Sequence, residues 1–503
     1  MRLTLALLAA GLVLLALHDV NAHPAGSPFI SIPISRIGSR TDVLPLPPTI
    51  VHQQHANRAI RRFEHLTGSH THTSDDVLLA NLQRRAAALP AHIQKRFYHP
   101  GLDLLHRLSI AGKHAPDSPV SNAQARPATF KADGDVREGV TPGRKPTFPH
   151  TIALDIQSKD IGYIGKVQIG TPPRDFMLLM DSGSADLWVG AEGCQDDDLW
   201  DDFEGCGDHT FLGPESSSTF NDTKKPWKIE YGTGAVSGTL VTDNIAIAGM
   251  KLPNHKFGVA KNESREFTPD YIPFDGLAGF AKSDISRQGT ITLVEALHQA
   301  GRIPRAIVSY HIPRLADGHN YGELTLGALN PARYRAETLV QVRNISPFGF
   351  WEARVESVRV GGKDMRWKNR TAIFDTGTTL LVAPKADVDA IHRHIPGAWY
   401  DPDPYGLGTW TVPCVPAPSS SKKPVFALTL GGRAFNVDAR DIPFLPIDEA
   451  DPQGNCTSGI TAGDIGGAEQ WLVGDVFLKN VYMSTDVGSD MISFAKLKPA
   501  SGK

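Results

Sequence analysis

Long apolar runs are scarce in this chain of 503 residues. One such run, residues 3–17, follows Arg2 and precedes a short segment at 20–22, which is the pattern of a secretory signal peptide over residues 1–22. An N-terminal membrane anchor is the alternative, but the run is shorter than the roughly 20 residues that a span needs. No later stretch is long and apolar enough to cross a membrane, and residues 496–503 are polar. We therefore expect a secreted protein without a membrane anchor, with the vacuole or lysosome as the alternative destination.

Cysteine is also scarce, with four in the whole chain. Cys194 lies close to Cys206 in the sequence, and Cys414 lies close to Cys456. An even count in an exported chain favours two disulfides that close local loops. A zinc site is the competing interpretation, but the spacings are too long for Cys-x-x-Cys pairs and no histidine lies beside them. Because nothing indicates a metal, an organic cofactor, nucleic-acid binding or an obligate oligomer, we expect a monomer without a cofactor.

Net charge is small, −3 at pH 7, but it is unevenly distributed. Residues 23–148 contain 16 Lys and Arg against 9 Asp and Glu, and ten of the 19 histidines; residues 149–503 contain 34 basic against 44 acidic residues. A basic segment ahead of an acidic body predicts a propeptide that is held by opposite charge and acts as an intramolecular inhibitor. A disordered basic tail is the alternative, which we expect for residues 23–60. Residues 78–110 carry apolar residues at helical intervals and are expected to fold on the body.

Two routes would remove such a propeptide. Acid would protonate the carboxylates that hold it, loosen the contact and permit self-processing. The dibasic pairs Lys95-Arg96 and Arg144-Lys145 instead favour cleavage by a convertase.

From residue 149 onward the pattern is that of strands and turns. Apolar residues alternate with polar ones over short stretches that end in glycine or proline, with 47 Gly and 37 Pro in the chain. Helical patterns are few: residues 293–300 are one, and residues 385–395 are another, with Pro384 in a favourable first-turn position. The composition therefore favours an all-β protein.

An internal repeat is the most informative feature of the sequence. Asp181-Ser182-Gly183-Ser184 has a counterpart in residues 375–378, and both follow apolar runs. Each Asp is followed by a further glycine at nearly the same distance, 98 residues on at Gly279 and 99 residues on at Gly474. The repeat predicts two related units, an N-terminal lobe at 149–325 and a C-terminal lobe at 326–503.

The repeated unit suits paired carboxylates. In each copy a carboxylate lies at the end of an apolar strand, glycine two residues on permits a sharp turn, and a hydroxyl follows that is able to donate a hydrogen bond to it. One such triplet is common in ordinary turns, but two copies related by symmetry would bring Asp181 and Asp375 face to face. Two close carboxylates share a proton, so that one acts as general base on a water and the other polarises the bond under attack.

Five separated motifs, in this order, resemble those of the pepsin family of aspartic proteases over residues 152–495. They are residues 181–189, 231–234, 274–279, 374–378 and 471–477. The resemblance, to a fungal-like member with a signal peptide and a long propeptide, implies an all-β bilobal fold of two related β-barrel-like lobes with the active-site cleft between them. It also implies that a peptide substrate binds extended across that cleft and that Asp181 and Asp375 are catalytic.

The resemblance further implies roles for neighbouring residues. Tyr231 would hydrogen-bond Trp188 and cap the site, while Ser184 and Thr378 would orient the two carboxylates. The substrate main chain would be held by Gly183, Gly232, Thr233 and Gly377.

Two features depart from the family pattern. Ser182 stands where Thr is usual; because the bridging hydroxyl is kept, we expect activity to be kept. The acidic segment between Cys194 and Cys206 is long for the family, and is interpreted either as a solvated loop or as part of the cleft rim.

Specificity and modification follow as expectations. Thr233 at the flap tip offers no counter-charge for a basic side chain, so we expect cleavage between large apolar residues. Asn-x-Ser/Thr sequons predict glycosylation at Asn221, Asn262, Asn344, Asn369 and Asn455. A non-catalytic peptide-binding protein on the same fold is the alternative function; a glycosidase needs a wider carboxylate separation and no duplicated loop.

Overall fold

The computed structural model describes residues 48–67, 140–158, 160–196, 205–231, 234–264, 267–268, 272–401, 409–416, 425–448, 450–463 and 467–499. The predicted signal peptide, the predicted helical segment 78–110 and Lys95-Arg96 lie outside these residues.

The first lobe is built on one large sheet. Its strands, in spatial order, are β1 (Val140–Thr141), β3 (Asp155–Gln157), β4 (Gly162–Ile169), β5 (Arg174–Asp181), β10 (Gly276–Gly279), β6 (Leu187–Asp196), β9 (Met250–Glu263), β8 (Ala235–Ile247) and β7 (Asn221–Glu230). The alternation predicted from sequence is visible in β4, where Val167 and Ile169 are buried and Lys166 and Gln168 are exposed.

The second lobe contains three smaller sheets. They are β14 (Glu352–Arg354), β17 (Thr371–Phe374), β26 (Gln470–Val473), β18 (Leu381–Ala383) and β25 (Ile460–Ala462); β16 (Lys363–Asp364), β15 (Ser357–Val360), β21 (Phe426–Leu430) and β22 (Arg433–Val437); and β19 (Trp399–Asp401), β20 (Thr409–Pro413), β24 (Asn455–Ser458) and β23 (Pro443–Pro446).

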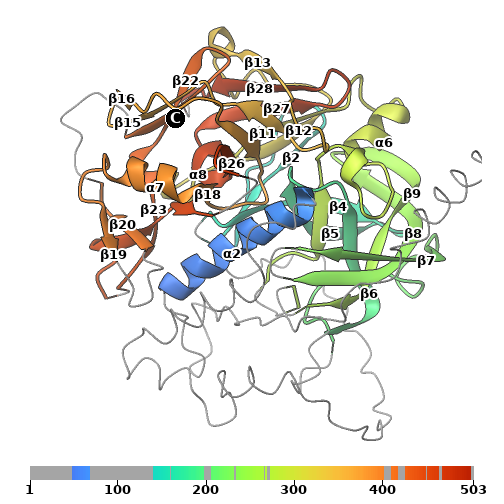
Figure 1. The fold of residues 1–503 in the computed structure, drawn as a ribbon. Helices are drawn as coiled ribbons and strands as arrows, with labels where there is room; N and C mark the ends of the chain where they lie inside the picture. Colours follow the sequence, from blue (N-terminus) through green and yellow to red (C-terminus); the bar gives the residue numbers. More distant parts are fainter. Residues whose placement is uncertain are drawn as a thin grey trace, which may run out of the picture.

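A six-stranded sheet joins the lobes, with three strands that precede residue 327 and three that follow it. Its order is β13 (Val340–Arg343), β28 (Met491–Lys496), β27 (Val481–Asp486), β11 (Ile307–His311), β12 (Glu323–Leu326) and β2 (Thr151–Ala153). Figure 1 shows the green strands of the first lobe on one side and the orange and red strands of the second on the other. The predicted all-β bilobal fold is confirmed.

Helices are few among the described residues, and from residue 149 onward they are short, as the sequence predicts. They are α2 (Pro48–Thr67), α6 (Leu293–Gln299), α7 (Lys385–His392) and α8 (Asp475–Leu478), with 3-10 turns η1 (Ser283–Ile285), η2 (Leu315–Asp317), η3 (Ala336–Thr338) and η4 (Ala439–Asp441). Thr292 and Glu295 form a capping box that starts α6. Pro384 is the N-cap residue of α7. Among the described residues, none of these helices combines the length and apolar character needed to cross a bilayer.

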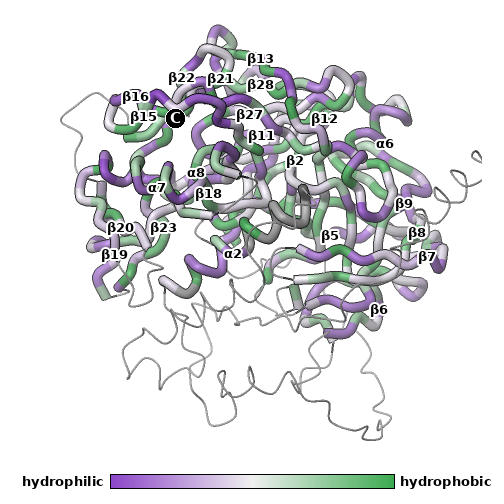
Figure 2. Tube along the Cα trace, viewed as in Figure 1, coloured by the Kyte–Doolittle hydropathy of each residue, from purple (hydrophilic) through white to green (hydrophobic). Residues whose placement is uncertain are grey.

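One apolar cluster forms the core of both lobes, and it includes Phe176 and Phe257 in the first and Phe374 and Phe494 in the second. Figure 2 shows apolar residues along the inner strands and polar residues at the outer turns.

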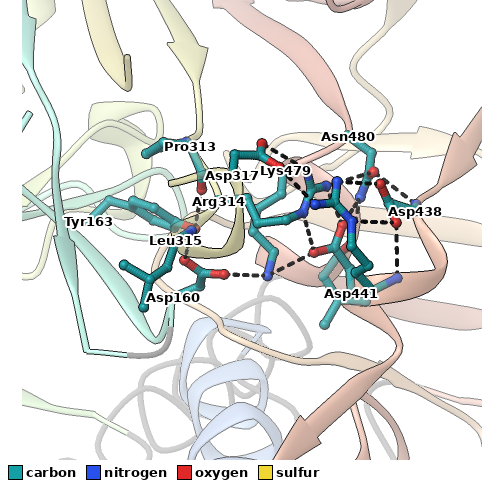
Figure 3. A network of polar contacts seen from close by, with 12 residues as sticks. Asp160, Tyr163, Pro313, Arg314, Leu315, Asp317, Asp438, Asp441, Lys479 and Asn480 are labelled. Atoms are coloured by element: carbon teal, nitrogen blue, oxygen red, sulfur yellow. Dashed lines mark hydrogen bonds and ion pairs between the residues drawn. The ribbon is translucent and has the colours of Figure 1, made fainter. Parts of the chain in front are cut away.

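A buried polar network also ties the lobes together (Figure 3). Arg314 donates from Nε and Nη2 to the two carboxylate oxygens of Asp441, at 2.7 and 2.5 Å. Lys479 Nζ lies 3.1 Å from Asp160 of the first lobe and 3.2 Å from Asp441 of the second. Burial alone would lower the pKa of Lys479, but the Asp441 and Asp160 carboxylates raise it above its ordinary value. A buried cation of this kind is stable only while it keeps its carboxylate partners.

The structure differs from the sequence-based prediction at the N-terminal side. Residues 48–60, expected to belong to a disordered tail, are part of α2, which lies against the second lobe. Residues 140–148, which fall within the predicted propeptide, contact the first lobe: Val140 and Thr141 pair with β3, and Arg144 N donates to Asn320 O. Both segments have weak apolar patterns, so only their tertiary contacts define them.

Candidate active site

The two repeated Asp residues occupy equivalent places in the two lobes. Asp181 ends β5, which pairs in parallel with β10; Asp375 follows β17, which pairs in parallel with β26. Gly279 lies opposite Asp181 in register, and Val473 lies opposite Phe374. The separations of 98 and 99 residues seen in the sequence are therefore the registers of these two strand pairs.

Each carboxylate receives a matched pair of hydrogen bonds. Gly183 N donates to Asp181 Oδ1 at 2.9 Å, and Ser184 Oγ donates to Asp181 Oδ2 at 2.5 Å. The second loop has the same two bonds to Asp375, from Gly377 N at 2.8 Å and Thr378 Oγ1 at 2.5 Å. Both carboxylates are fully buried, so these bonds fix their orientation without competition from solvent.

The two loops also bind each other. Ser182 Oγ accepts from Thr376 N at 2.9 Å and donates to Phe374 O at 3.2 Å. Thr376 Oγ1 accepts from Ser182 N at 2.9 Å and donates to Met180 O at 2.8 Å. Ser182 thus makes the bridging contacts expected of its hydroxyl, and the absence of a methyl group there breaks none of them.

Glycine is required where the loops approach most closely. A Cβ added at Gly183 would lie 2.5 Å from Cγ of Asp375, so the first loop touches the second carboxylate. A Cβ at Gly279 would lie 2.5 Å from Ser184 O, and one at Gly474 would lie 1.9 Å from Thr378 O. Such separations exclude any side chain at these positions.

The base of the predicted flap is formed by β7 and β8. Trp188 Nε1 donates to Tyr231 OH at 2.7 Å, which is the contact that the resemblance implied. Phe267 packs edge-on to both rings, at centroid distances of 5.4 and 5.6 Å. Gly232 and Thr233, at the tip, lie outside the described residues.

Several residues of the flap base and of the carboxylate site were not identified from sequence. Phe267 is one, because a single aromatic residue in a loop carries no positional signal. Tyr310 on β11 is another: burial raises its pKa well above 10, and the nearby charges of Asp181 and Asp375 raise it further. Asp186 accepts from Ser286 Oγ and two backbone N–H groups, and burial raises its pKa.

An apolar cluster of the second lobe includes residues that are close to Asp375 in the sequence. It comprises Phe350, Ile373, Leu380, Val382 and Leu472, and α2 contributes Ala59 and Ile60 to it. Leu380 and Val382 lie five and seven residues after Asp375, the positions that Asp186 and Trp188 hold after Asp181. Aligning the two copies of the repeat in the sequence would therefore have pointed to Leu380 and Val382.

Both predicted disulfides are formed, Cys194–Cys206 and Cys414–Cys456. Glu263 lies next to the first, but disulfide sulfurs offer no thiolate ligands for a metal. Glu263 is buried, and burial together with Asp275 and Asp196 raises its pKa to about 8. Most of the acidic segment between Cys194 and Cys206 lies outside the described residues.

The five sequons lie in different surroundings. Asn221, Asn369 and Asn455 are exposed and Asn262 is half-buried. Asn344 is 4% exposed, its Nδ2 donates to Asp490, and its Oδ1 accepts from Glu352 N. A glycan at Asn344 would break these bonds, so the prediction for this sequon does not fit the folded chain.

Comparisons with known proteins agree with this geometry. The family model described as eukaryotic aspartyl protease matches residues 162–497. A probable aspartic-type endopeptidase CTSD of Arthroderma benhamiae is 32% identical over 393 residues, which are 78% of this chain and 72% of that protein. Human napsin-A is 32% identical over 71% of this chain and 80% of its own length, and chymosin of Camelus dromedarius is 30% identical over 70% and 84%.

The matched region contains both lobes, and the relatives cover more than two thirds of the chain. The repeat, its strand registers and these similarities agree: the chain belongs to the eukaryotic aspartyl protease family and is an aspartic-type endopeptidase of the pepsin type.

Proposed function

We propose that the protein hydrolyses internal peptide bonds of proteins at acid pH, with Asp181 and Asp375 as the catalytic pair. The observation that carries the proposal is the contact between the loops: the backbone of Gly183 lies against the Asp375 carboxylate, and both carboxylates have the same two donors. The family as a whole is known to let such a pair share one proton.

In the proposed reaction one carboxylate is ionised and the other is protonated. The ionised carboxylate takes a proton from a bound water, whose oxygen attacks the carbonyl carbon of the scissile bond. The protonated carboxyl donates a hydrogen bond to the carbonyl oxygen and stabilises the charge that develops there. When the tetrahedral intermediate breaks down, a proton passes to the leaving nitrogen, and acid and amine products separate. The titration belongs to the pair and not to either residue.

We propose that Ser184 and Thr378 orient these carboxylates and that Gly183, Gly232, Thr233 and Gly377 hold the substrate backbone. The hydrogen bond between Trp188 and Tyr231 supports a capping role for the flap, since it fixes the tyrosine at the flap base. Thr233, which offers no counter-charge at the flap tip, supports a preference for large apolar side chains around the cut. A peptide library tests this preference, and efficient cleavage after Lys would contradict it.

We propose that the protein is made as a zymogen with a signal peptide at 1–22 and a propeptide from residue 23, and that it acts as a monomer. The burial of Ala59 and Ile60 of α2 in the apolar cluster that contains Ile373 and Leu380 of the second lobe supports an inhibitory role for the propeptide. We propose secretion, with the vacuole or lysosome as the alternative, and glycans on the exposed Asn221, Asn369 and Asn455. Sequencing the N-terminus of active material locates the cut; a start before residue 23 would contradict the zymogen proposal.

Casein hydrolysis at about pH 4, with and without pepstatin, tests the reaction. We expect activity that pepstatin abolishes in the wild-type protein, and none in Asp181→Asn. Asp364→Asn, at an exposed position on β16 of the second lobe, is the matched control and should remain active. A wild-type protein that binds pepstatin but does not cleave casein would instead support the alternative of a non-catalytic peptide-binding protein.

A further inference from the structure

Residues 140–148 lie within the predicted propeptide, but they pack on the first lobe; we call them the N-terminal strap. Val140 and Thr141 form β1, which pairs antiparallel with β3 at the edge of the large sheet. The chain then passes close to the corner between β2 and β3. A Cβ on Gly143 would lie 2.7 Å from Leu154 O, which leaves no room for a side chain there.

A buried amide, Asn320, fastens the strap to the segment before β12. Its Nδ2 donates to Thr141 O at 3.0 Å and to Leu154 O at 2.8 Å, so both amide hydrogens are used. Its Oδ1 accepts from Gly322 N at 2.8 Å. Asn320 is 4% exposed. Because a buried donor without a partner is costly, removal of the strap would destabilise this corner of the first lobe.

Further bonds hold the two residues that follow β1 most closely to the body. Gly143 N donates to Asp155 Oδ1 at 2.6 Å, and Arg144 N donates to Asn320 O at 3.0 Å. The Arg144 guanidinium lies 4.6 Å from the ring centroid of Tyr321 and donates from Nη1 to the Tyr321 hydroxyl at 2.8 Å. Arg144 is exposed, but a protease must draw the backbone beside the cut into its own cleft, and this backbone is bound.

The sequence of the strap also disfavours cleavage at its two most obvious sites. The bond after the pair Arg144-Lys145 joins Lys145 to Pro146, and the aromatic residue of the strap, Phe148, is followed by Pro149. Proline carries a ring carbon where other residues carry the N–H of the leaving nitrogen. A protease site shaped for an N–H therefore accepts neither bond well.

We infer that the maturation cut lies upstream of Val140, and that the N-terminal strap remains in the active enzyme as part of the first lobe. The inference rests on the proposed zymogen and names the boundary of its propeptide. The boundary moves from residue 148, and Arg144-Lys145 is no longer a candidate cleavage site. Of the two dibasic pairs named from sequence, Lys95-Arg96 stays a candidate. The cut is a hydrolysis, in which water supplies the hydroxyl of the new C-terminus and a hydrogen of the new N-terminus.

N-terminal sequencing of the active wild-type protein, together with its intact mass, tests the inference. We expect the chain to begin after His23 and no later than Val140. A start beyond Val140 would overturn the inference while leaving the proposed zymogen intact. An active chain that begins at His23 or earlier would contradict the zymogen itself, and the boundary with it.

Incubation with a dibasic-specific convertase separates the two causes of protection, in the Asp181→Asn background that prevents self-processing. In Pro146→Ala the bond after Lys145 is an ordinary amide, and only the contacts of the strap protect it. Adding Asn320→Ala frees the strap and should speed this cleavage by about tenfold or more. Adding Asn436→Ala instead, at an exposed position of β22, is the control and should leave the slow rate unchanged.

Mass spectrometry of the products locates each cut, and urea unfolding checks that every variant is folded. Cleavage of the chain with Pro146 in place, between Lys145 and Pro146, would overturn the inference. Equal rates with and without Asn320→Ala would also overturn it, because the strap would then not be held as the structure shows. Should Asn320→Ala fail to fold, Tyr321→Leu, which removes the contacts with the Arg144 side chain, takes its place and should speed the same cleavage.

Discussion

Asp181 in the first lobe and Asp375 in the second each accept one bond from a glycine N–H and one from a hydroxyl, at nearly equal distances. Five residues further on the lobes differ, with the buried acid Asp186 in one and Leu380 in the other. At the residue after Gly279 and Gly474 the difference is reversed: the first lobe has the apolar Phe280, and the second has the buried acid Asp475. Duplication has kept the donors to the carboxylates and changed the residues packed behind them.

Trp188 and Val382, each seven residues after the Asp of its lobe, have different roles in the two lobes. Trp188 donates to Tyr231 and so supports the flap of the first lobe. Val382, at the same distance after Asp375, packs in the cluster that receives α2. The first lobe therefore uses this position to support the β7–β8 hairpin, and the second lobe uses it to pack against α2.

Gly183→Ala should have the largest effect, because its Cβ would displace the carboxylate of the other lobe. We expect kcat for casein to fall by about 100-fold or more with the fold retained. Gly322→Ala places a Cβ 2.5 Å from Pro313 Cγ, an equal clash elsewhere in the first lobe, and should cost stability and not kcat. Unchanged kcat in Gly183→Ala would show that the two loops do not meet.

Loss of the hydroxyl of Ser182 or of Thr376, which link the two loops, should have the next largest effect, on the free energy of unfolding. Thr376→Val and Ser182→Ala each leave a buried N–H and a buried carbonyl unsatisfied, so each should lower the free energy of unfolding by about 2 to 3 kcal/mol. Ser182→Thr keeps the hydroxyl and should stay within about 1 kcal/mol of wild type. Urea unfolding measures all three. A large loss in Ser182→Thr would mean that the first loop has no room for the methyl group.

A buried titrating group in each lobe makes stability depend on pH, in opposite directions in the two lobes. Glu263 of the first lobe, with a pKa of about 8, is protonated in the folded chain over a range where it ionises in the unfolded chain, so stability falls as pH rises from 4.5 to 8. His392 of the second lobe, with a pKa of about 4, costs stability as pH falls from 6.5 to 4.

Replacing Glu263 or His392 with Gln should remove the part of the pH dependence of stability that comes from that residue. Relative to wild type, Glu263→Gln should gain stability with rising pH and His392→Gln with falling pH, each on the order of 2 kcal/mol across its range. Thermal unfolding from about pH 4 to about pH 8 measures both. Parallel curves for wild type and Glu263→Gln would show that the carboxyl is ionised in the folded protein.

Tyr231→Phe should have the smallest effect of the four. It removes one hydrogen bond to Trp188, which we expect to lower kcat/KM by about tenfold while leaving the urea midpoint unchanged. The control Val382→Ala changes the equivalent region of the second lobe and should leave the flap intact. Equal losses in stability for both variants would argue that the tyrosine is only a packing residue.

Much of this architecture was accessible from sequence because the repeat is a direct consequence of strand register. The spacing from Asp181 to Gly279 equals the pairing of β5 with β10, and the short helices at α6 and α7 carry ordinary capping and apolar patterns. Helix α2 was missed because its buried residues are Ala, His, Gln, Asn and a single Ile, a composition that resembles a polar tail. The burial of Asn344 likewise depends on Asp490, far away in sequence.

The central claim is that one carboxylate from each lobe acts as a single unit. Casein hydrolysis at acid pH by Asp181→Asn, Asp375→Asn and the double variant tests it most directly, with folding checked by urea unfolding. We predict equal and near-complete losses in the two single variants and no further loss in the double variant, since removing either partner already disables the pair. Substantial activity in one single variant, or a double loss equal to the product of the two single losses, would contradict the account.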